Sequence, residues 1–106
     1  MTNITADGDK LAVFLSGEID HHSCIQIRQD VDAEILKTHP NEIVLDFGKV
    51  TFMDSSGIGL IMGRYKLASG YGAQVTVTEA SGYLRRVMRL AGLDSIVNIK
   101  AKEDKK

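Results

Sequence analysis

The hydrophobic pattern begins with a two-residue alternation near the start of the chain. Residues 10–16 contain alternating apolar positions, a period typical of a half-buried strand. An Asp-Gly dipeptide stands at positions 7 and 8, and Asp-Gly between two short extended segments is a strong hairpin signal. Residues 3–6 and 10–16 are therefore predicted to pair as an antiparallel hairpin, with Gly17 ending the second strand.

Three later stretches carry apolar residues at spacings of three and four, which is the period of an amphipathic α-helix. Pro40 ends the first predicted helix, Gly70 and Gly72 close the second, and Gly92 ends the third. The apolar stripes consist of Cys24, Ile27, Val31 and Ile35 in the first helix, Ile58, Ile61, Met62, Tyr65 and Ala68 in the second, and Leu84, Val87, Met88 and Ala91 in the third.

Short apolar or β-branched runs separate the predicted helices. Residues 43–45 and 74–78 are typical of strands, and residues 96–99 are predicted to form a short terminal strand. This order predicts an α/β fold, with a mixed, mainly parallel sheet, an N-terminal antiparallel hairpin and helices packed on the sheet. The charged residues 100–106 are expected to fray.

Function in such sheets gathers at the carboxyl ends of the strands. Three loops are predicted to lie there, at residues 17–22, 48–54 and 79–82. Residues that are distant in the sequence are therefore expected to meet at one edge of the sheet.

The composition narrows the class of protein. The 106 residues fit one domain, residues 1–106, and 43% hydrophobic with 25% charged residues is an ordinary globular composition. A net charge of −1 offers no electrostatic footprint for direct nucleic-acid binding. The single cysteine fits a reducing compartment, residues 1–10 do not resemble a signal peptide, and no apolar run approaches the ~18 residues of a membrane span. We therefore expect a cytoplasmic domain that does not bind membranes.

Candidate chemistry lies in the tetrapeptide Asp54-Ser55-Ser56-Gly57, where a strand leads into the second helix. Asp54 suits a helix N-cap, because its carboxylate can accept from backbone N–H groups two or three residues on. Ser55 and Ser56 would then occupy the first turn, where free N–H groups and the helix dipole favour negative charge. A phosphate on either serine would be tolerated there, although the same residue types also serve as simple helix caps.

A catalytic serine is one alternative interpretation of this tetrapeptide. His21 or His22 could reach the same sheet edge as Ser55 and form a Ser–His pair. However, Met53 stands where a nucleophile elbow needs a small residue, and no oxyanion motif accompanies the serine.

Nucleotide binding is another alternative. The glycines at 57, 59 and 63, with Glu79 about twenty residues on, look like a dinucleotide-binding loop. The preceding strand is expected to finish near Phe47, which would leave a long loop instead of the tight turn that such a site requires. The chain is also too short for a second half that would hold a cofactor or substrate, so no cofactor is expected.

Two further clusters are candidates for a metal site or a docking surface. Residues 20–24 include two adjacent histidines, but neighbouring helical residues diverge by about 100° and no second ligand cluster accompanies them, so no metal site is expected. Arg85, Arg86 and Arg89 give the third helix a basic side, which is either a solvated face or a docking surface.

Three stretches of the chain resemble one bacterial family. The segment FMDSSGIGLIMGRYK at residues 52–66 is similar to the characteristic segment of anti-sigma factor antagonists. LSGEIDHH at 15–22 and LRRVMRLAGL at 84–93 match the same family in the same register. The resemblance is strongest to the sporulation type, the anti-sigma F factor antagonists, and it implies the STAS fold.

The resemblance implies a binding switch and not an enzyme. In that family the serine after the aspartate, Ser55 here, is phosphorylated by the anti-sigma factor, which is a serine kinase of the GHKL type. The unphosphorylated antagonist binds this kinase and releases the sigma factor, whereas the phosphorylated form is released and reset by a PP2C-type phosphatase. The alternative is a nucleotide-binding or scaffold STAS module without a phospho-switch. On a domain expected to be monomeric when free, the partner-binding residues would be Glu18, Asp20, His21, Asp54, Ser55, Ser56, Gly57 and Gly59.

Overall fold

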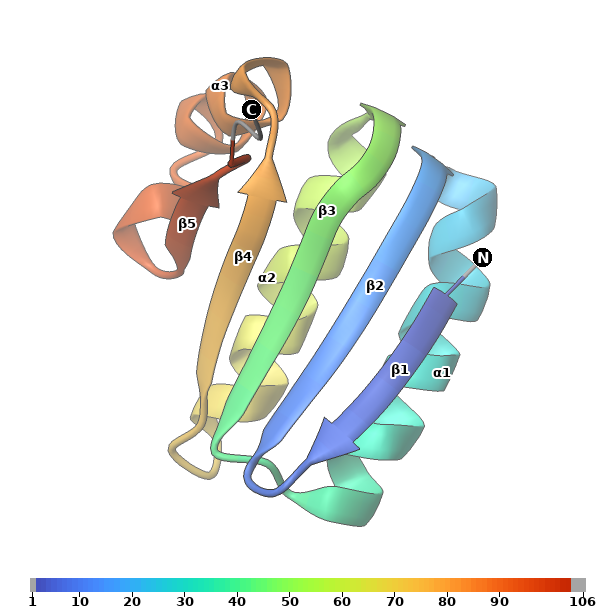
Figure 1. Cartoon of the computed structure of the whole chain (residues 1–106), viewed down its shortest axis with the longest axis vertical. Helices are drawn as coiled ribbons and strands as arrows, with labels where there is room; N and C mark the ends of the chain where they lie inside the picture. The colour runs from blue at the N-terminus through green and yellow to red at the C-terminus, as the bar shows by residue number, and fades with distance from the viewer. Residues whose placement is uncertain (1, 104–106) are drawn as a thin grey trace.

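A computed structural model describes residues 2–103, which form one five-stranded sheet with three helices (Figure 1). The strand order is β1-β2-β3-β4-β5; β1 is antiparallel to β2, and every other pair is parallel. The predicted α/β fold with its N-terminal hairpin is therefore confirmed. In chain order the elements are β1 (Thr2–Asp7), β2 (Lys10–Ile19), α1 (His21–Thr38), β3 (Glu42–Met53), α2 (Ser55–Ser69), β4 (Gln74–Ala80), α3 (Gly82–Leu90), a 3₁₀ turn η1 (Leu93–Ser95) and β5 (Asn98–Ala101).

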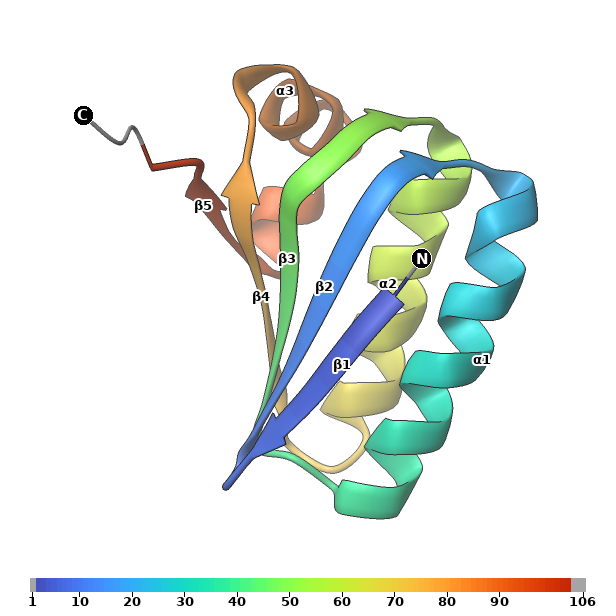
Figure 2. The same cartoon turned by 45° about the vertical axis from the view of Figure 1, so that its right-hand side comes forward.

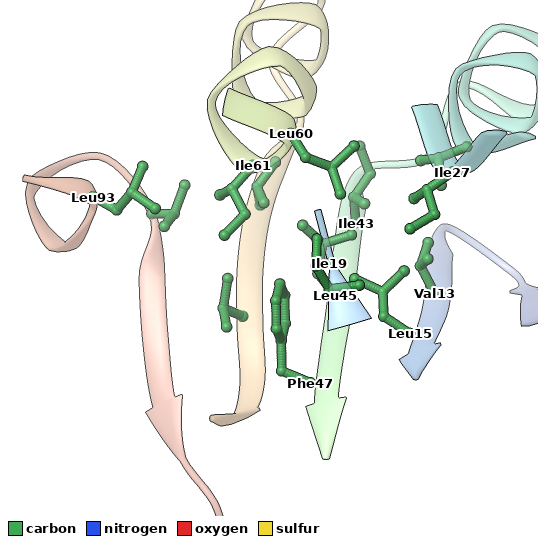
Figure 3. Close-up of a cluster of buried hydrophobic side chains, with 14 of the residues drawn as sticks. Val13, Leu15, Ile19, Ile27, Ile43, Leu45, Phe47, Leu60, Ile61 and Leu93 are labelled. Carbon is green, nitrogen blue, oxygen red and sulfur yellow. The ribbon is translucent and has the colours of Figure 1, made fainter. Parts of the chain in front are cut away.

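The hydrophobic core lies between the sheet and the two long helices. Figure 2 shows α1 and α2 side by side on one face of the sheet, and no helix formed by residues 2–103 covers the opposite face. Alternate residues of β2 and β3 point into this layer and meet the helical stripes, as the close-up in Figure 3 shows. The largest fully buried side chains are Leu11, Leu15, Ile19, Ile35, Ile43, Leu45, Phe47, Met53, Ile61, Leu84, Met88 and Leu93.

Two strands are longer than the sequence indicated. β2 continues through Gly17 to Ile19, and β3 continues past Phe47 to Met53. Gly17 has a φ of +77° next to a shift in register, so a bulge bends β2 without ending it. Most of the expected loop at 48–54 is therefore strand, and the expected loop at 17–22 divides into the end of β2, the single residue Asp20 and the start of α1. Only single residues separate the ends of these strands from the following helices.

The C-terminal strand also differs from the prediction. β5 covers Asn98–Ala101, not 96–99, because Ile96 still closes the 3₁₀ turn. Fraying does not begin at residue 100: the Lys102 N–H donates to the carbonyl of Ala80 at 2.9 Å, and Lys102 Nζ donates to the carbonyl of Gly48 at 3.0 Å. The rest of the predicted frayed tail, residues 104–106, lies outside the described residues.

An arginine stands in the apolar stripe of α2. Met62 was predicted to belong to this stripe but is 36% exposed, whereas Arg64 is only 5% exposed. Arg64 Nε lies 2.7 Å from Asp32 Oδ1 of α1, and a second nitrogen, Nη1, donates to the carbonyl of Leu60 at 3.2 Å. Burial lowers the pKa of Arg64, and the carboxylate of Asp32 opposes that shift. This ion pair joins α1 to α2 beneath the surface.

Removing the acidic partner of this pair should destabilise the fold. Asp32→Ala leaves a buried guanidinium uncompensated, which costs 3–5 kcal/mol in fully buried pairs; because Asp32 is 30% exposed, we expect a loss of about 2 kcal/mol. Urea unfolding would measure the loss. Asp30→Ala, which removes a surface hydrogen bond to Gln26 within α1, is the control and should cost at most about 0.5 kcal/mol. Equal losses in the two variants would contradict a structural role for the ion pair.

Candidate functional site

Two strand ends lie side by side at the carboxyl edge of the sheet. Ile19 is the last residue of β2 and pairs with Met53, the last residue of β3. The following residue of each segment, Asp20 or Asp54, caps the next helix, and the Asp54 N–H donates to the carbonyl of Ile19 at 3.3 Å. The helices α1 and α2 therefore begin beside each other at the upper edge of Figure 1.

Asp54 forms the N-cap that its sequence position predicts. Its backbone is extended, with φ −104° and ψ −167°, and its Oδ1 accepts from the Ser56 N–H at 2.8 Å. Its carbonyl accepts from the Gly57 N–H at 3.0 Å. Ser55, the first helical residue, is exposed, whereas Ser56 is half-buried. The hydroxyl of Ser55 is thus available to a macromolecule that approaches this edge.

Asp20 caps α1 through a reciprocal pair of hydrogen bonds. Asp20 Oδ1 accepts from the Ser23 N–H at 2.9 Å, and the Asp20 N–H donates to Ser23 Oγ at 3.0 Å. The backbone N–H of Ser23 is the largest influence on the pKa of Asp20 and lowers it, although desolvation opposes the shift. A carboxylate with a lowered pKa is ionised at neutral pH, so the edge carries negative charge at Asp20.

A small hollow of about 270 Å³ separates the first turns of α1 and α2. Burial raises the pKa of the Cys24 thiol, and the nearby charges of Asp54 and Asp20 raise it further. The thiol therefore stays protonated at neutral pH, and its surroundings do not favour an anion. The walls of the hollow consist of His21, Cys24, Ile25, Arg28, Ser56, Gly59, Leu60 and Arg64; Ser55 is not part of them.

Only one of the two candidate glycines is required for packing. A Cβ on Gly57 would lie 2.2 Å from Met53 Cγ and 3.2 Å from Ile19 Cγ2, so the missing side chain lets α2 begin directly against the strand ends. Gly59 is exposed, and nothing would lie within 4 Å of its Cβ. Close packing of α2 against the sheet therefore requires a glycine at position 57 but not at position 59.

Tyr83 belongs to this edge, although no sequence pattern indicated it. It follows β4 in the first turn of α3, and its hydroxyl donates to the carbonyl of Met53 at 3.3 Å. The phenol therefore holds the residue that immediately precedes the Asp54 cap. Its partner lies 30 residues away in the chain, so no local pattern could have indicated the contact.

The predicted site residues are only partly brought together. Asp20, His21 and Ser56 lie around the starts of α1 and α2, and Glu18 is exposed near the end of β2. Gly57 is buried and so can shape this surface without presenting a side chain. Within residues 2–103, neither Ser55 nor Ser56 forms a hydrogen bond with a histidine, so the geometry offers no Ser–His pair.

One of the two features expected to exclude a nucleotide site is absent from the structure. Since β3 reaches Met53, a tight strand-to-helix turn does precede the glycine-rich segment, contrary to the long loop expected after Phe47. The volume of the hollow still argues against nucleotide binding. The hollow beside Gly59 has a volume of about 270 Å³, whereas ligand pockets usually have about 300–1,000 Å³.

Other features of the described chain do not point to a ligand, metal or membrane site near Ser55. An open groove of about 720 Å³ is lined by charges of both signs, with Lys49 and Lys102 on one hand and Asp46 and Glu79 on the other, and Ser55 is not among its lining residues. No group of three or more His, Cys, Asp or Glu residues in the described chain could hold a metal ion. None of the described helices is both long and apolar enough to cross a membrane.

Comparison with known proteins identifies the family. The STAS domain family matches residues 2–106. The anti-sigma F factor antagonist of Paenibacillus polymyxa is 39% identical over 89 residues, which cover 84% of this chain and 76% of the relative. The chain belongs to the anti-sigma factor antagonist family of STAS domains.

Solved structures agree with this assignment. The anti-sigma factor antagonist SpoIIAA in its unphosphorylated form superposes with a TM-score of 0.82 at 27% identity, covering 93% of this chain and 87% of that one. The Bacillus cell fate determinant SpoIIAA in its phosphorylated form superposes with a TM-score of 0.75 at 27% identity, covering 93% and 90%. The STAS fold expected from the resemblance is thereby confirmed, and the family is regulatory, not catalytic.

The two glycines of this STAS domain provide a matched pair of substitutions. Gly57→Ala forces Met53 and Ile19 to move in a closed core, at a cost of about 1–3 kcal/mol that exceeds the ~0.5–1 kcal/mol gained in helix propensity. Gly59→Ala meets open space and should stabilise the domain by about 0.5–1 kcal/mol. Thermal unfolding of both variants would show whether each substitution stabilises or destabilises the domain. A stabilised Gly57→Ala variant would contradict the close packing of α2 on the strand ends.

Proposed function

We propose that this STAS domain is an anti-anti-sigma factor whose binding is switched off by phosphorylation of Ser55. Unphosphorylated, it binds an anti-sigma factor that is a GHKL-type serine kinase, and the sigma factor is released. Phosphorylation by that kinase ends the complex, and a PP2C-type phosphatase resets the domain in the cytoplasm. The similarity to anti-sigma F factor antagonists supports a sporulation sigma factor as the target. The domain itself acts as substrate and inhibitor and catalyses no reaction.

The observation that carries this proposal is the exposed hydroxyl of Ser55 in the first turn of α2. A kinase must reach its acceptor hydroxyl, and Ser55 is exposed directly after a helix cap that fixes its backbone. Phosphate at a helix N-terminus interacts favourably with the dipole and the free N–H groups, so the modified domain stays folded. The phosphate therefore changes the affinity for the partner and not the stability of the fold.

Charge and desolvation explain how a phosphate would abolish binding. The group adds about −1.5 to −2 charges next to Asp54, and the ionised Asp20 lies at the same edge. Two unit charges of like sign about 4 Å apart repel by about 1 kcal/mol in water and by about 4 kcal/mol at an effective dielectric near 20, so a partner that excludes water here raises the repulsion by about 3 kcal/mol. An increase of this size on binding lowers affinity by about a hundredfold or more, which is sufficient for a switch.

The assignment of the acceptor is tested by phosphorylation with the cognate anti-sigma kinase and ATP. Intact mass and site mapping should show one added phosphate at Ser55. Ser55→Ala should remain unmodified, whereas Ser56→Ala, which removes the half-buried neighbour, should still be phosphorylated. An unmodified wild-type domain beside an active kinase control would favour a scaffold or ligand-binding STAS module, with Asp54-Ser55 acting only as a helix cap.

The switch itself is tested by affinity for the anti-sigma factor. Ser55→Ala should bind about as tightly as the unmodified domain, because only a small exposed hydroxyl is lost. Ser55→Asp introduces one negative charge where the phosphate would introduce up to two, so its affinity should fall by about tenfold to a hundredfold. Isothermal titration calorimetry would measure both. Equal affinities would rule out an electrostatic switch at this position.

A further inference from the structure

The outer face of α3 carries a stripe of three exposed side chains. Tyr83, Arg86 and Leu90 are spaced by three and four residues and therefore lie on one face of the helix. Tyr83 is 47% exposed and Leu90 is 83% exposed. The opposite face packs into the core through Leu84 and Met88. We call Tyr83, Arg86 and Leu90 the α3 stripe.

The positive charge of this stripe has no counter-charge among the residues that the structure describes. Helix α3 contains three arginines and no acidic residue. Arg85 Nε donates to the carbonyl of Ala80 at 3.3 Å, and Arg89 lines a small hollow together with Asp94. Arg86 forms neither an ion pair nor a hydrogen bond with any residue in the described range 2–103. An exposed arginine flanked by an aromatic and an aliphatic side chain is typical of an interface anchor.

The stripe is continuous with the edge that holds Ser55. The Tyr83 hydroxyl contacts the carbonyl of Met53, two residues before Ser55, and α3 begins at the same upper edge as α2 (Figure 1). The surface therefore carries two signs of charge. Carboxylates at Asp20 and Asp54 lie on the side of α1 and α2, and the guanidinium of Arg86 lies on the side of α3.

The usual size of protein interfaces supports a partner-binding surface that includes both the starts of α1 and α2 and the α3 stripe. A stable protein–protein interface has about 20–30 residues on each partner. The caps and first turns of α1 and α2 provide only a fraction of that number. The partner-binding surface therefore has to extend onto a neighbouring element. The Tyr83–Met53 hydrogen bond joins the α3 stripe to the sheet edge that holds Ser55.

We infer that the α3 stripe forms the second half of the anti-sigma factor's footprint and contacts an acidic surface with an apolar pocket on that partner. This inference rests on the proposed function and specifies how the partner is recognised. Leu90 fills the apolar pocket, and Arg86 pairs with a carboxylate of the partner. The guanidinium of Arg86 on only one side of this surface fixes one orientation of the complex, because a rotated partner would bring its acidic surface against Asp20 and Asp54.

Charge reversal at the centre of the stripe tests the inference. Arg86→Glu should weaken binding of the unphosphorylated domain by about tenfold or more, and the loss should shrink as salt is raised from 50 to 300 mM. Leu90→Ala should weaken binding with little dependence on salt. Lys37→Glu is the matched control: it makes the same charge change at the last turn of α1, at the opposite edge of the sheet, and should leave affinity nearly unchanged.

The outcomes separate this inference from the proposed function. Unchanged affinity of Arg86→Glu, with Ser55→Asp still weakened, would overturn the α3 footprint and leave the switch intact. No binding by the wild-type domain would overturn the proposed function itself. If Arg86→Glu alters only dephosphorylation, or only binding to vesicles containing anionic lipid, the stripe serves another partner and the inference fails. Circular dichroism melts and the milder Arg86→Gln variant would separate a binding defect from a folding defect.

Discussion

The in-register pairing of β2 with β3 up to their last residues is the constraint on which the site depends. Ile19 pairs with Met53, and the Asp54 N–H donates to the carbonyl of Ile19, so the two strands end at the same level. Each strand is followed by a single residue and then a helix. A shift of one residue in either strand would turn its buried side chains to the other face and would move one cap away from the other.

The same residues that end the strands also give the edge its charge. Asp54 and Asp20 satisfy N–H groups that would otherwise remain unpaired at the helix starts, and each brings a carboxylate to the surface. The cap of α2 thus has two consequences: it fixes the backbone of Ser55, and it places a negative charge beside that hydroxyl. A phosphate at Ser55 is compatible with the helix but adds to the charge of the surface.

Local patterns predicted the order of the elements but not their ends or their long-range contacts. The apolar spacings that located α1, α2 and α3 and the Asp-Gly hairpin are local, and the structure confirms those elements. β2 and β3 were predicted too short because Gly17 and Gly48 interrupt their patterns, while their pairing with each other continues. The roles of Arg64 and Tyr83 could not be predicted, since their partners lie about 30 residues away.

The proposed footprint, with carboxylates on one side and Arg86 on the other, would also constrain what phosphorylation can do. In the proposed switch, the phosphate at Ser55 would add negative charge on the side of Asp54, away from the α3 helix face that carries Arg86, so it would weaken one half of the footprint and leave the α3 stripe unmodified. The released domain would then keep the surface that first attracts a partner, and the loss of affinity would come from the close contacts around Ser55. Because changes at close, desolvated contacts act mainly on dissociation, phosphorylation would act as a release step, and dephosphorylation would restore binding without refolding the domain.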